Sequence, residues 1–205
     1  MSDQIIVVCD RSGSMASIAS DMEPAMNKFI KEQASVGDAQ LRVVMFDDQY
    51  EVAFDGPIKG EVPEFKLEPR GMTALCDAVG KAVADVTVSG CAKCGDRTIL
   101  VVITDGMENA SREWNAGSVK SRIKELDKHE NFSAVFLGAD IDAIGGGAGV
   151  GIGANNAVNY SKSRKGTEAI LRSTSANMMA FRSGGDKASS MTYTTDQRKE
   201  AVDNS

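Results

Sequence analysis

The oxygen-bearing side chains of Asp10, Ser12 and Ser14 directly follow an apolar run at residues 5–9. Asp105 follows a second apolar run at residues 98–104, and Thr73 precedes an apolar segment that begins at residue 74. Carboxylate and hydroxyl oxygens are hard ligands that suit Mg²⁺ or Mn²⁺. The five side chains are therefore candidate metal ligands, provided that the fold brings three separate segments together.

This donor set predicts a metal ion that keeps much of its positive charge. Mg²⁺ takes six ligands and gives up its water molecules reluctantly. If the hydroxyl groups bind the ion directly, and one or both aspartates act through water, the ion favours an anionic oxygen from another molecule. Gly13, Gly71 and Gly106 lie beside the candidate ligands, where glycine allows the chain to turn sharply.

Apolar patterns around these residues predict the elements that must position them. An unbroken apolar run predicts a buried strand at residues 5–9, and largely apolar runs predict further strands at 41–46, 98–104 and 134–137. Residues 51–54 are predicted to pair with 41–46 as a hairpin, and 155–160 to form a short edge strand. Helical spacing predicts helices near residues 18–30, 74–86, 119–126 and 170–181. Ser20 and Glu23 are interpreted as a capping box near the start of the first helix.

The alternation of strands and helices predicts an α/β fold with a doubly wound, mostly parallel sheet and helices on both faces. Ligands of such sheets bind beyond the carboxyl ends of the strands, where the strand order reverses. Asp10 and Asp105 meet there if their strands are neighbours. We expect one domain at residues 1–185, followed by a polar tail at 186–205 that is partly mobile or holds one short helix.

Composition limits the function classes. The 205 residues carry a net charge of −6, which argues against nucleic acid and anionic membranes as partners because both require a basic surface. The sequence has no apolar run of about 20 residues and no secretory-signal pattern ahead of residue 5, so we expect a cytoplasmic protein. Cys91 and Cys94 form a single C-x-x-C pair. Without a second such pair we favour two reduced surface thiols over a zinc site or a disulfide.

Two further groups have competing interpretations. Asp77 and Glu108 either orient the candidate ligands or are solvated acids, and Arg11 and Arg70 either steer an acidic partner or have no such role. Residues 145–153 are rich in glycine, and Gly149-x-Gly151-x-x-Ala154 matches a dinucleotide-binding fingerprint. That fingerprint should directly join a strand to a helix, which it does not do here. We therefore expect an irregular helix, since each glycine weakens a helix by ~1 kcal/mol relative to alanine.

Together, Asp10-x-Ser12-x-Ser14, Thr73 and Asp105-Gly106 resemble the metal-ion-dependent adhesion site (MIDAS) of von Willebrand factor type A (VWA) domains. Residues 71–78, 104–111 and 136–143 resemble bacterial and phage stand-alone members in particular, and the resemblance covers about residues 4–183. It implies a Rossmann-like sheet in the order 3-2-1-4-5-6 with the third strand antiparallel.

The resemblance also implies roles for the five residues. Ser12, Ser14 and Thr73 would contact the metal directly, Thr73 depending on conformation, and Asp10 and Asp105 would act directly or through water. The metal would be Mg²⁺ or Mn²⁺, with Ca²⁺ as an alternative. A partner protein's Asp or Glu would complete the ligand shell.

Three functions are weighed on these grounds. The first is a non-enzymatic, metal-dependent protein-binding module that captures an acidic side chain. The second is a Mg²⁺-dependent hydrolase, either a phosphatase or a nuclease. It is disfavoured because Ser12 stands where an aspartyl phosphatase would have its second aspartate, and two-metal nucleases need more carboxylates. The third is a structural or self-assembly protein, a homo-oligomer in which the same site binds another copy of the chain.

Overall fold

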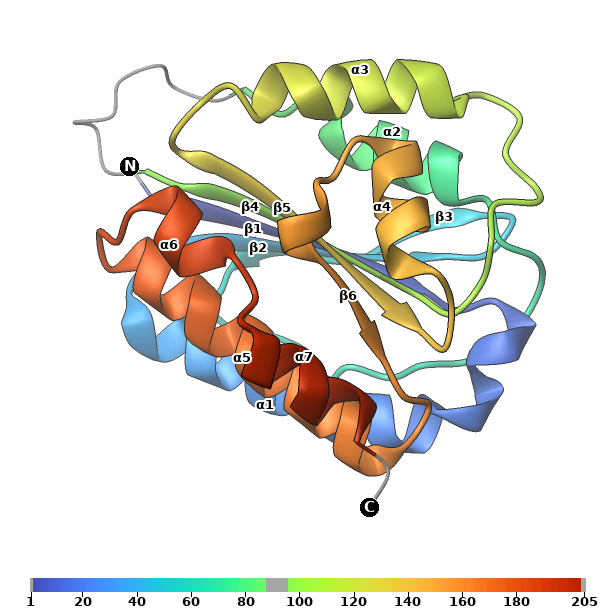
Figure 1. Cartoon of the computed structure of the whole chain (residues 1–205), viewed down its shortest axis with the longest axis horizontal. Coiled ribbons are helices and arrows are strands. Elements are labelled where there is room, and N and C mark those ends of the chain that lie inside the picture. Colours follow the sequence, from blue (N-terminus) through green and yellow to red (C-terminus); the bar gives the residue numbers. More distant parts are fainter. Residues whose placement is uncertain (1, 88–95, 204–205) are drawn as a thin grey trace.

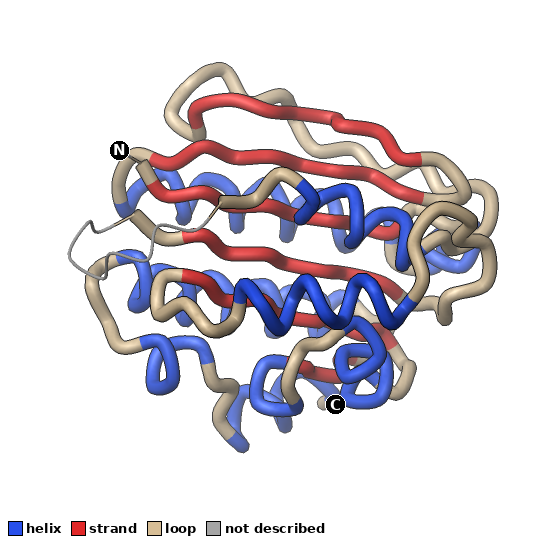
Figure 2. Tube along the Cα trace, turned by 90° about the horizontal axis from the view of Figure 1, so that it is seen from above, coloured by secondary structure: helices blue, strands red, loops and turns tan. Residues whose placement is uncertain are grey.

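The computed structural model describes residues 2–87 and 96–203. A six-stranded sheet runs through the centre in the order β3-β2-β1-β4-β5-β6 (Figures 1 and 2). β3 runs antiparallel to β2, and the other neighbouring strands are parallel. The predicted doubly wound fold class is confirmed, including the single antiparallel edge strand. The strands are β1 (Asp3–Asp10), β2 (Ala39–Phe46), β3 (Tyr50–Pro57), β4 (Thr98–Thr104), β5 (Phe132–Ala139) and β6 (Ala157–Tyr160).

Helices cover both faces of the sheet (Figure 1). One layer holds α1 (Ala19–Val36), α5 (Arg164–Arg182), α6 (Lys187–Met191) and α7 (Thr195–Val202), and the other holds α2 (Leu75–Ala84), α3 (Ala116–Leu126) and α4 (Ala143–Val150). Successive side chains of a strand point to opposite faces, which divides the core in two. Val7 of β1 belongs to the cluster under α1 and α5, and its neighbour Val8 to the cluster under α2 and α3.

The predicted elements are present, with ends that differ by a few residues. β4 has the predicted bounds because its seven residues are all buried and polar residues follow at once. The capping box assigned to Ser20 and Glu23 is wrong. Helix α1 begins at Ala19, so Ser20 lies inside it, and Oε1 of Glu23 instead accepts a hydrogen bond from the backbone N–H of Leu67 at 2.9 Å.

Residues 186–203 include two helices, α6 and α7, where we expected a polar tail that is partly mobile or holds one short helix. Met191, Tyr193 and Ala201 are buried in the core cluster that also contains α5 residues. The hydroxyl groups of Tyr193 and Thr174 lie 2.7 Å apart in a hydrogen bond. The segment is polar on average, but its few apolar side chains are placed where they pack on α5.

The glycine-rich segment forms a regular helix, α4, rather than the irregular one we expected. Asp142 caps its start by accepting a hydrogen bond from the N–H of Gly145 at 2.9 Å. A Cβ on Gly147 would lie only 3.0 Å from the Cβ of Ala157, so glycine lets α4 pack closely on the sheet. Gly151 ends the helix with a φ of +95°. The supposed fingerprint therefore spans the C-terminus of α4, and not the strand-to-helix junction at which the N-terminus of a helix binds phosphate.

Two sequence expectations concern membranes and cysteines. Among the described residues, no helix combines the length and the apolar character needed to cross a bilayer. Cys9 and Cys76 are buried free thiols. Cys91 and Cys94 lie outside the described residues.

Candidate metal centre

The parallel pairing of β1 with β4 brings the two candidate aspartates to the same edge of the sheet. Cys9 pairs with Ile103, one residue before the end of each strand. Asp10 ends β1 and Asp105 follows β4, and both are buried. Thr104, the last residue of β4, donates a hydrogen bond from its hydroxyl to Oδ2 of Asp10 at 2.5 Å. The sheet topology alone therefore sets two carboxylates beside each other.

The loop after β1 adds two serine hydroxyls to this edge. Its backbone turns sharply, since the N–H of Ser12 donates to Oδ1 of Asp10 at 2.6 Å, and a 3₁₀ helix follows at Gly13–Ser17. The Ser14 hydroxyl donates to Oδ1 of Asp105 at 2.6 Å, and the Ser12 and Ser14 oxygens lie 3.1 Å apart. Ser12 is buried and Ser14 is exposed. The cluster of candidate ligands therefore faces solvent on the side formed by Ser14.

Thr73 completes the set from the loop that precedes α2. The N–H of Thr73 donates to Oδ1 of Asn109 at 2.9 Å, and the N–H of Asn109 donates to the Thr73 carbonyl at 3.0 Å. A Cβ on Gly106 would lie 2.9 Å from the Thr73 hydroxyl and 3.7 Å from Oδ2 of Asp10. Glycine at 106 thus allows Thr73 to approach Asp10. The structure brings all five predicted ligands together, and their binding of a metal stays a prediction.

The electrostatics of this cluster favour a cation. Burial raises the pKa of Asp10 above its usual value, the nearby charge of Asp105 raises it further, and the hydrogen bonds from Thr104 and Ser12 oppose that rise. Oδ2 of Asp105 is buried, and among the described residues it is held by an ion pair with Nζ of Lys162 at 2.8 Å. Two buried carboxylates beside three hydroxyl groups fit a hard divalent ion, which would stabilise their charged forms.

Comparisons with known proteins bear on the fold. No family model and no curated protein matches the sequence, but solved structures do. One is the ArnB paralog VWA2 from Sulfolobus acidocaldarius, with a TM-score of 0.59, 14% identity and coverage of 85% of this chain and 45% of that one. Another is a von Willebrand factor type A structure from Catenulispora acidiphila, with a TM-score of 0.61, 15% identity and coverage of 87% and 43%.

A third is proximal thread matrix protein 1 from the mussel byssus, described with a zinc-occupied MIDAS motif, at a TM-score of 0.61 and 17% identity. It covers 85% of this chain and 45% of that one. This chain has the von Willebrand factor type A fold. It spans less than half the length of the solved structures named here.

An ion-pair hub, formed by Asp47 with two arginines, connects the loops that carry the candidate ligands. Asp47 follows β2, and its Oδ2 accepts hydrogen bonds from Nε of Arg11 at 3.1 Å and Nε of Arg70 at 2.7 Å. Nη1 of Arg11 also donates to Glu51 at 2.7 Å. The Asp47 carbonyl accepts the N–H of Ala74, next to Thr73, at 2.8 Å. The candidate ligands lie on three metal loops: the first follows β1, the second precedes α2 and the third follows β4. The hub thus fixes the first and second metal loops against the β2–β3 hairpin.

This hub changes the interpretation of both arginines. Arg11 is buried between Asp47 and Glu51, so it positions the loop and has little surface to offer a partner. Arg70 remains half exposed, although Asp47 holds its Nε. Asp47 lies in the turn of the predicted hairpin, and no sequence pattern indicated its contacts with the two arginines.

Asp77 and Glu108 hold the third metal loop against α2. Asp77 accepts hydrogen bonds from the backbone N–H groups of Arg112, Glu113 and Trp114 at 2.6–2.9 Å. Glu108 accepts the N–H of Cys76 at 2.7 Å, together with N–H groups of its own loop. Burial alone would raise the pKa of each carboxyl, but these hydrogen bonds outweigh it and lower both. The two acids therefore position the loop, and neither is simply solvated.

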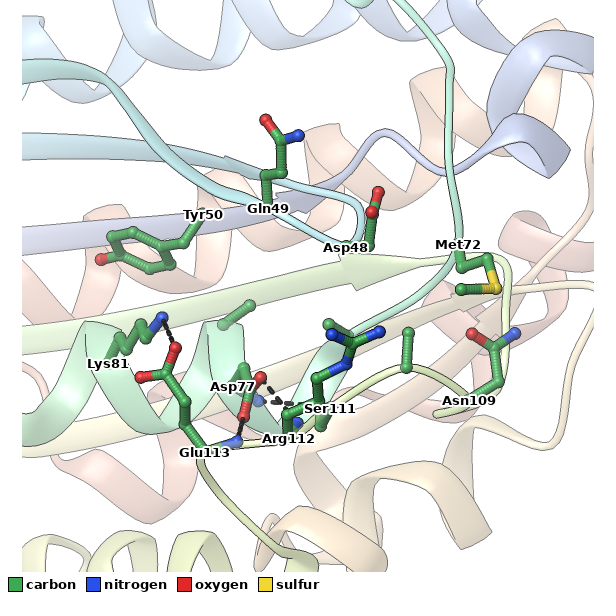
Figure 3. A pocket seen from close by; sticks show the side chains of 13 residues that line it. Asp48, Gln49, Tyr50, Met72, Asp77, Lys81, Asn109, Ser111, Arg112 and Glu113 are labelled. Atoms are coloured by element: carbon green, nitrogen blue, oxygen red, sulfur yellow. Dashed lines mark hydrogen bonds and ion pairs between the residues drawn. The ribbon is translucent and has the colours of Figure 1, made fainter.

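A polar groove of about 580 Å³ opens beside the candidate ligands, between the start of β3, α2 and the third metal loop (Figure 3). Asp77 reaches across to the loop, and Lys81 pairs with Glu113 at 2.7 Å. Met72, next to Thr73, lines one end and is half exposed. A side chain bound at the metal edge would therefore have a mixed polar and apolar surface beside it.

Proposed function

We propose that this chain binds a divalent metal ion and uses it to capture an acidic side chain of a partner protein. The ligands would be Asp10, Ser12, Ser14, Thr73 and Asp105. The observation that carries the proposal is their convergence at the carboxyl edge of the sheet around two buried carboxylates. A similar structure described with a zinc-occupied MIDAS supports a metal at this place in the fold.

The donor chemistry favours Mg²⁺ or Mn²⁺, with Ca²⁺ as an alternative, because every donor is an oxygen. Only two of the five donors carry charge. If one or both aspartates act through water, the bound ion would keep much of its positive charge and attract a carboxylate from outside. The exposed hydroxyl of Ser14 leaves a side of the cluster open to solvent, where such a carboxylate can enter.

A Mg²⁺-dependent hydrolase is the second candidate, and the described residues give it less support. Residues 2–87 and 96–203 contain no group of three or more His, Cys, Asp or Glu side chains arranged to hold a metal. A two-metal nuclease needs such carboxylate bridges. The hydroxyl-rich set found here suits one ion with an open coordination position.

Thermal unfolding with and without metal tests the metal site. A ligand present at 100 times its Kd stabilises the folded state by about 2.7 kcal/mol, which corresponds to a rise in Tm of roughly 5–11 °C for a chain of this size. Asp10→Ala and Asp105→Ala should each abolish the rise. Asp38 precedes β2 at the opposite end of the strands, and its side chain is 81% exposed. The variant Asp38→Ala should therefore keep the rise in Tm. A melting curve of the wild-type protein that does not respond to saturating Mg²⁺ or Mn²⁺ would refute the site.

Partner capture is tested separately with the double variant Ser12→Ala/Ser14→Ala. Wild-type protein immobilised in Mg²⁺ should retain a partner, and EDTA should release it. The immobilised double variant should not retain that partner. Light scattering in Mg²⁺ and in EDTA distinguishes a foreign partner from a second copy of the chain. A partner retained equally by both proteins in both buffers contradicts a metal-dependent interaction.

A further inference from the structure

A lysine side chain reaches the candidate metal centre from a segment that contributes none of the five ligands. Nζ of Lys162 lies 2.8 Å from Oδ2 of Asp105. The Asp105 side chain is fully buried, whereas 26% of the Lys162 side chain is exposed. The other oxygen of Asp105 accepts the hydrogen bond from Ser14. One carboxylate is therefore shared between a metal-loop hydroxyl and an ammonium group.

The backbone on either side of Lys162 is held firmly. Lys162 follows β6, and its N–H donates to Oδ2 of Asp140 at 3.2 Å. The N–H of Ser161 donates to the carbonyl of Ala201 in α7 at 2.9 Å, and Ser163 caps α5. Since the main chain is fixed at three points, Lys162 can leave Asp105 only by rotation of its own flexible side chain. Its partial exposure gives it a route to solvent.

We propose that Lys162 is a tethered cation that neutralises Asp105 in the metal-free protein and competes with the divalent ion for it. The proposal rests on the metal binding proposed above. An ammonium and a divalent ion at the same carboxylate repel each other strongly where water is excluded. Filling the site with metal therefore requires the ammonium to move out to solvent. Lys162 thereby sets the metal concentration at which the site becomes occupied.

Lys162→Met tests the competition, because methionine keeps an apolar stem and removes the charge. Titration calorimetry with MnCl₂ should give a Kd at least about tenfold lower than that of the wild type, the scale expected for losing a charged interaction that is partly shielded from water. Lys165→Met is the matched control. It removes the same charge from a lysine paired with Asp203 and 53% exposed, and its Kd should stay within about twofold of the wild type. Lys162→Arg, which keeps the charge, should resemble the wild type.

The outcomes separate this proposal from the proposed function. If wild type binds Mn²⁺ and Lys162→Met binds it no more tightly than Lys165→Met does, the competition is refuted and the metal site stands. If only Lys162→Met binds Mn²⁺, the competition is supported and metal dependence of the natural chain is refuted at the concentrations used. If neither binds, both proposals fail.

A second measurement uses the wild-type chain and does not depend on the folding of a variant. Acetylation of lysines, followed by mass spectrometry, reports how freely each amino group is exposed. Mg²⁺ at a concentration that raises the Tm should increase the acetylation rate of Lys162 several-fold and leave Lys165 unchanged. A rate at Lys162 that stays constant or falls while the Tm rises would overturn the proposal.

Discussion

Asp47→Asn is the substitution that most directly tests how the metal loops are held in place. The wild-type carboxylate is buried and accepts hydrogen bonds from Arg11, Arg70 and the backbone N–H of Gln49. Asparagine keeps nearly the same shape and can still accept the N–H of Gln49. The substitution therefore removes the negative charge and replaces Oδ2, the acceptor of both arginine Nε–H groups, with an amide NH₂ that cannot accept them.

The expected loss of stability depends on the two arginines that lose their carboxylate partner. Removing one member of a buried ion pair costs about 3–5 kcal/mol, because the other charge is left without compensation. Arg11 keeps its contact with Glu51, and Arg70 is half exposed, so the low end of that range applies. A loss of about 3 kcal/mol lowers the Tm by roughly 6–12 °C in a chain of this length.

The dependence on pH provides an independent check. Burial by itself raises the pKa of Asp47, but the hydrogen bonds from Arg70 and Gln49 and the charge of Arg11 outweigh it and hold the pKa below its usual value. A group with a lowered folded-state pKa stabilises the fold above its unfolded pKa, about 3.9 for aspartate, and loses that contribution as the pH falls through the folded-state pKa. The difference between wild type and Asp47→Asn should therefore be full at pH 7 and shrink below about pH 4.

Urea unfolding at pH 7 and at pH 3.5 measures both effects, and Asp55→Asn is the control. Asp55 pairs with Arg42 on the surface, with side chains 47% and 35% exposed, and such pairs contribute at most about 1 kcal/mol. A loss below about 1 kcal/mol for Asp47→Asn at pH 7, or equal losses for both variants, would refute the idea that a buried hub holds the loops.

Three further predictions use unfolding in urea as the measurement. Gly149→Ala in α4 should stabilise the protein by up to about 1 kcal/mol, because a Cβ there meets no atom within 4 Å. Gly80→Ala should destabilise it by about 1–3 kcal/mol, because its Cβ would overlap the Trp114 ring. Equal effects of the two substitutions contradict this packing. Glu108→Gln should cost about 2 kcal/mol, since the bond from Cys76 N–H loses its charge. That deficit should shrink below about pH 4.3, because the pKa of Glu108 is lowered, and a constant deficit down to pH 3.5 would contradict it.

The fold could largely be predicted from the sequence because burial leaves a periodic signal. β4 is apolar along its whole length and is bounded by polar residues, so its ends were evident. Hydrophobic periodicity does not indicate the order of the strands in the sheet. That order was predicted from the resemblance to VWA domains. Helix α4 shows the converse, because the low helix propensity of its glycines predicted an irregular helix. Packing of Gly147 against Ala157 and Phe136 outweighed that propensity.

The candidate ligands could be found because each lies directly beside a strong strand or helix signal. Asp47 and Lys162 could not, because their roles depend on which side chain lies opposite them in space. Arg11 is 36 residues away from Asp47 in the sequence, and Lys162 reaches Asp105 from the far side of β5. Hydrophobic periodicity reports which face of an element is buried, and it carries no information about such long-range polar pairs.

These pairs bear on what a metal ion would do to this protein. The first and second metal loops are joined through Asp47, and the third is held on α2 by Asp77 and Glu108. Lys162 supplies positive charge to Asp105 without any metal. The loops are thus assembled by the chain's own contacts. If the proposed function holds, metal binding would change the charge at the sheet edge far more than the backbone, and would act by creating an attractive point for a carboxylate on a surface that is already formed.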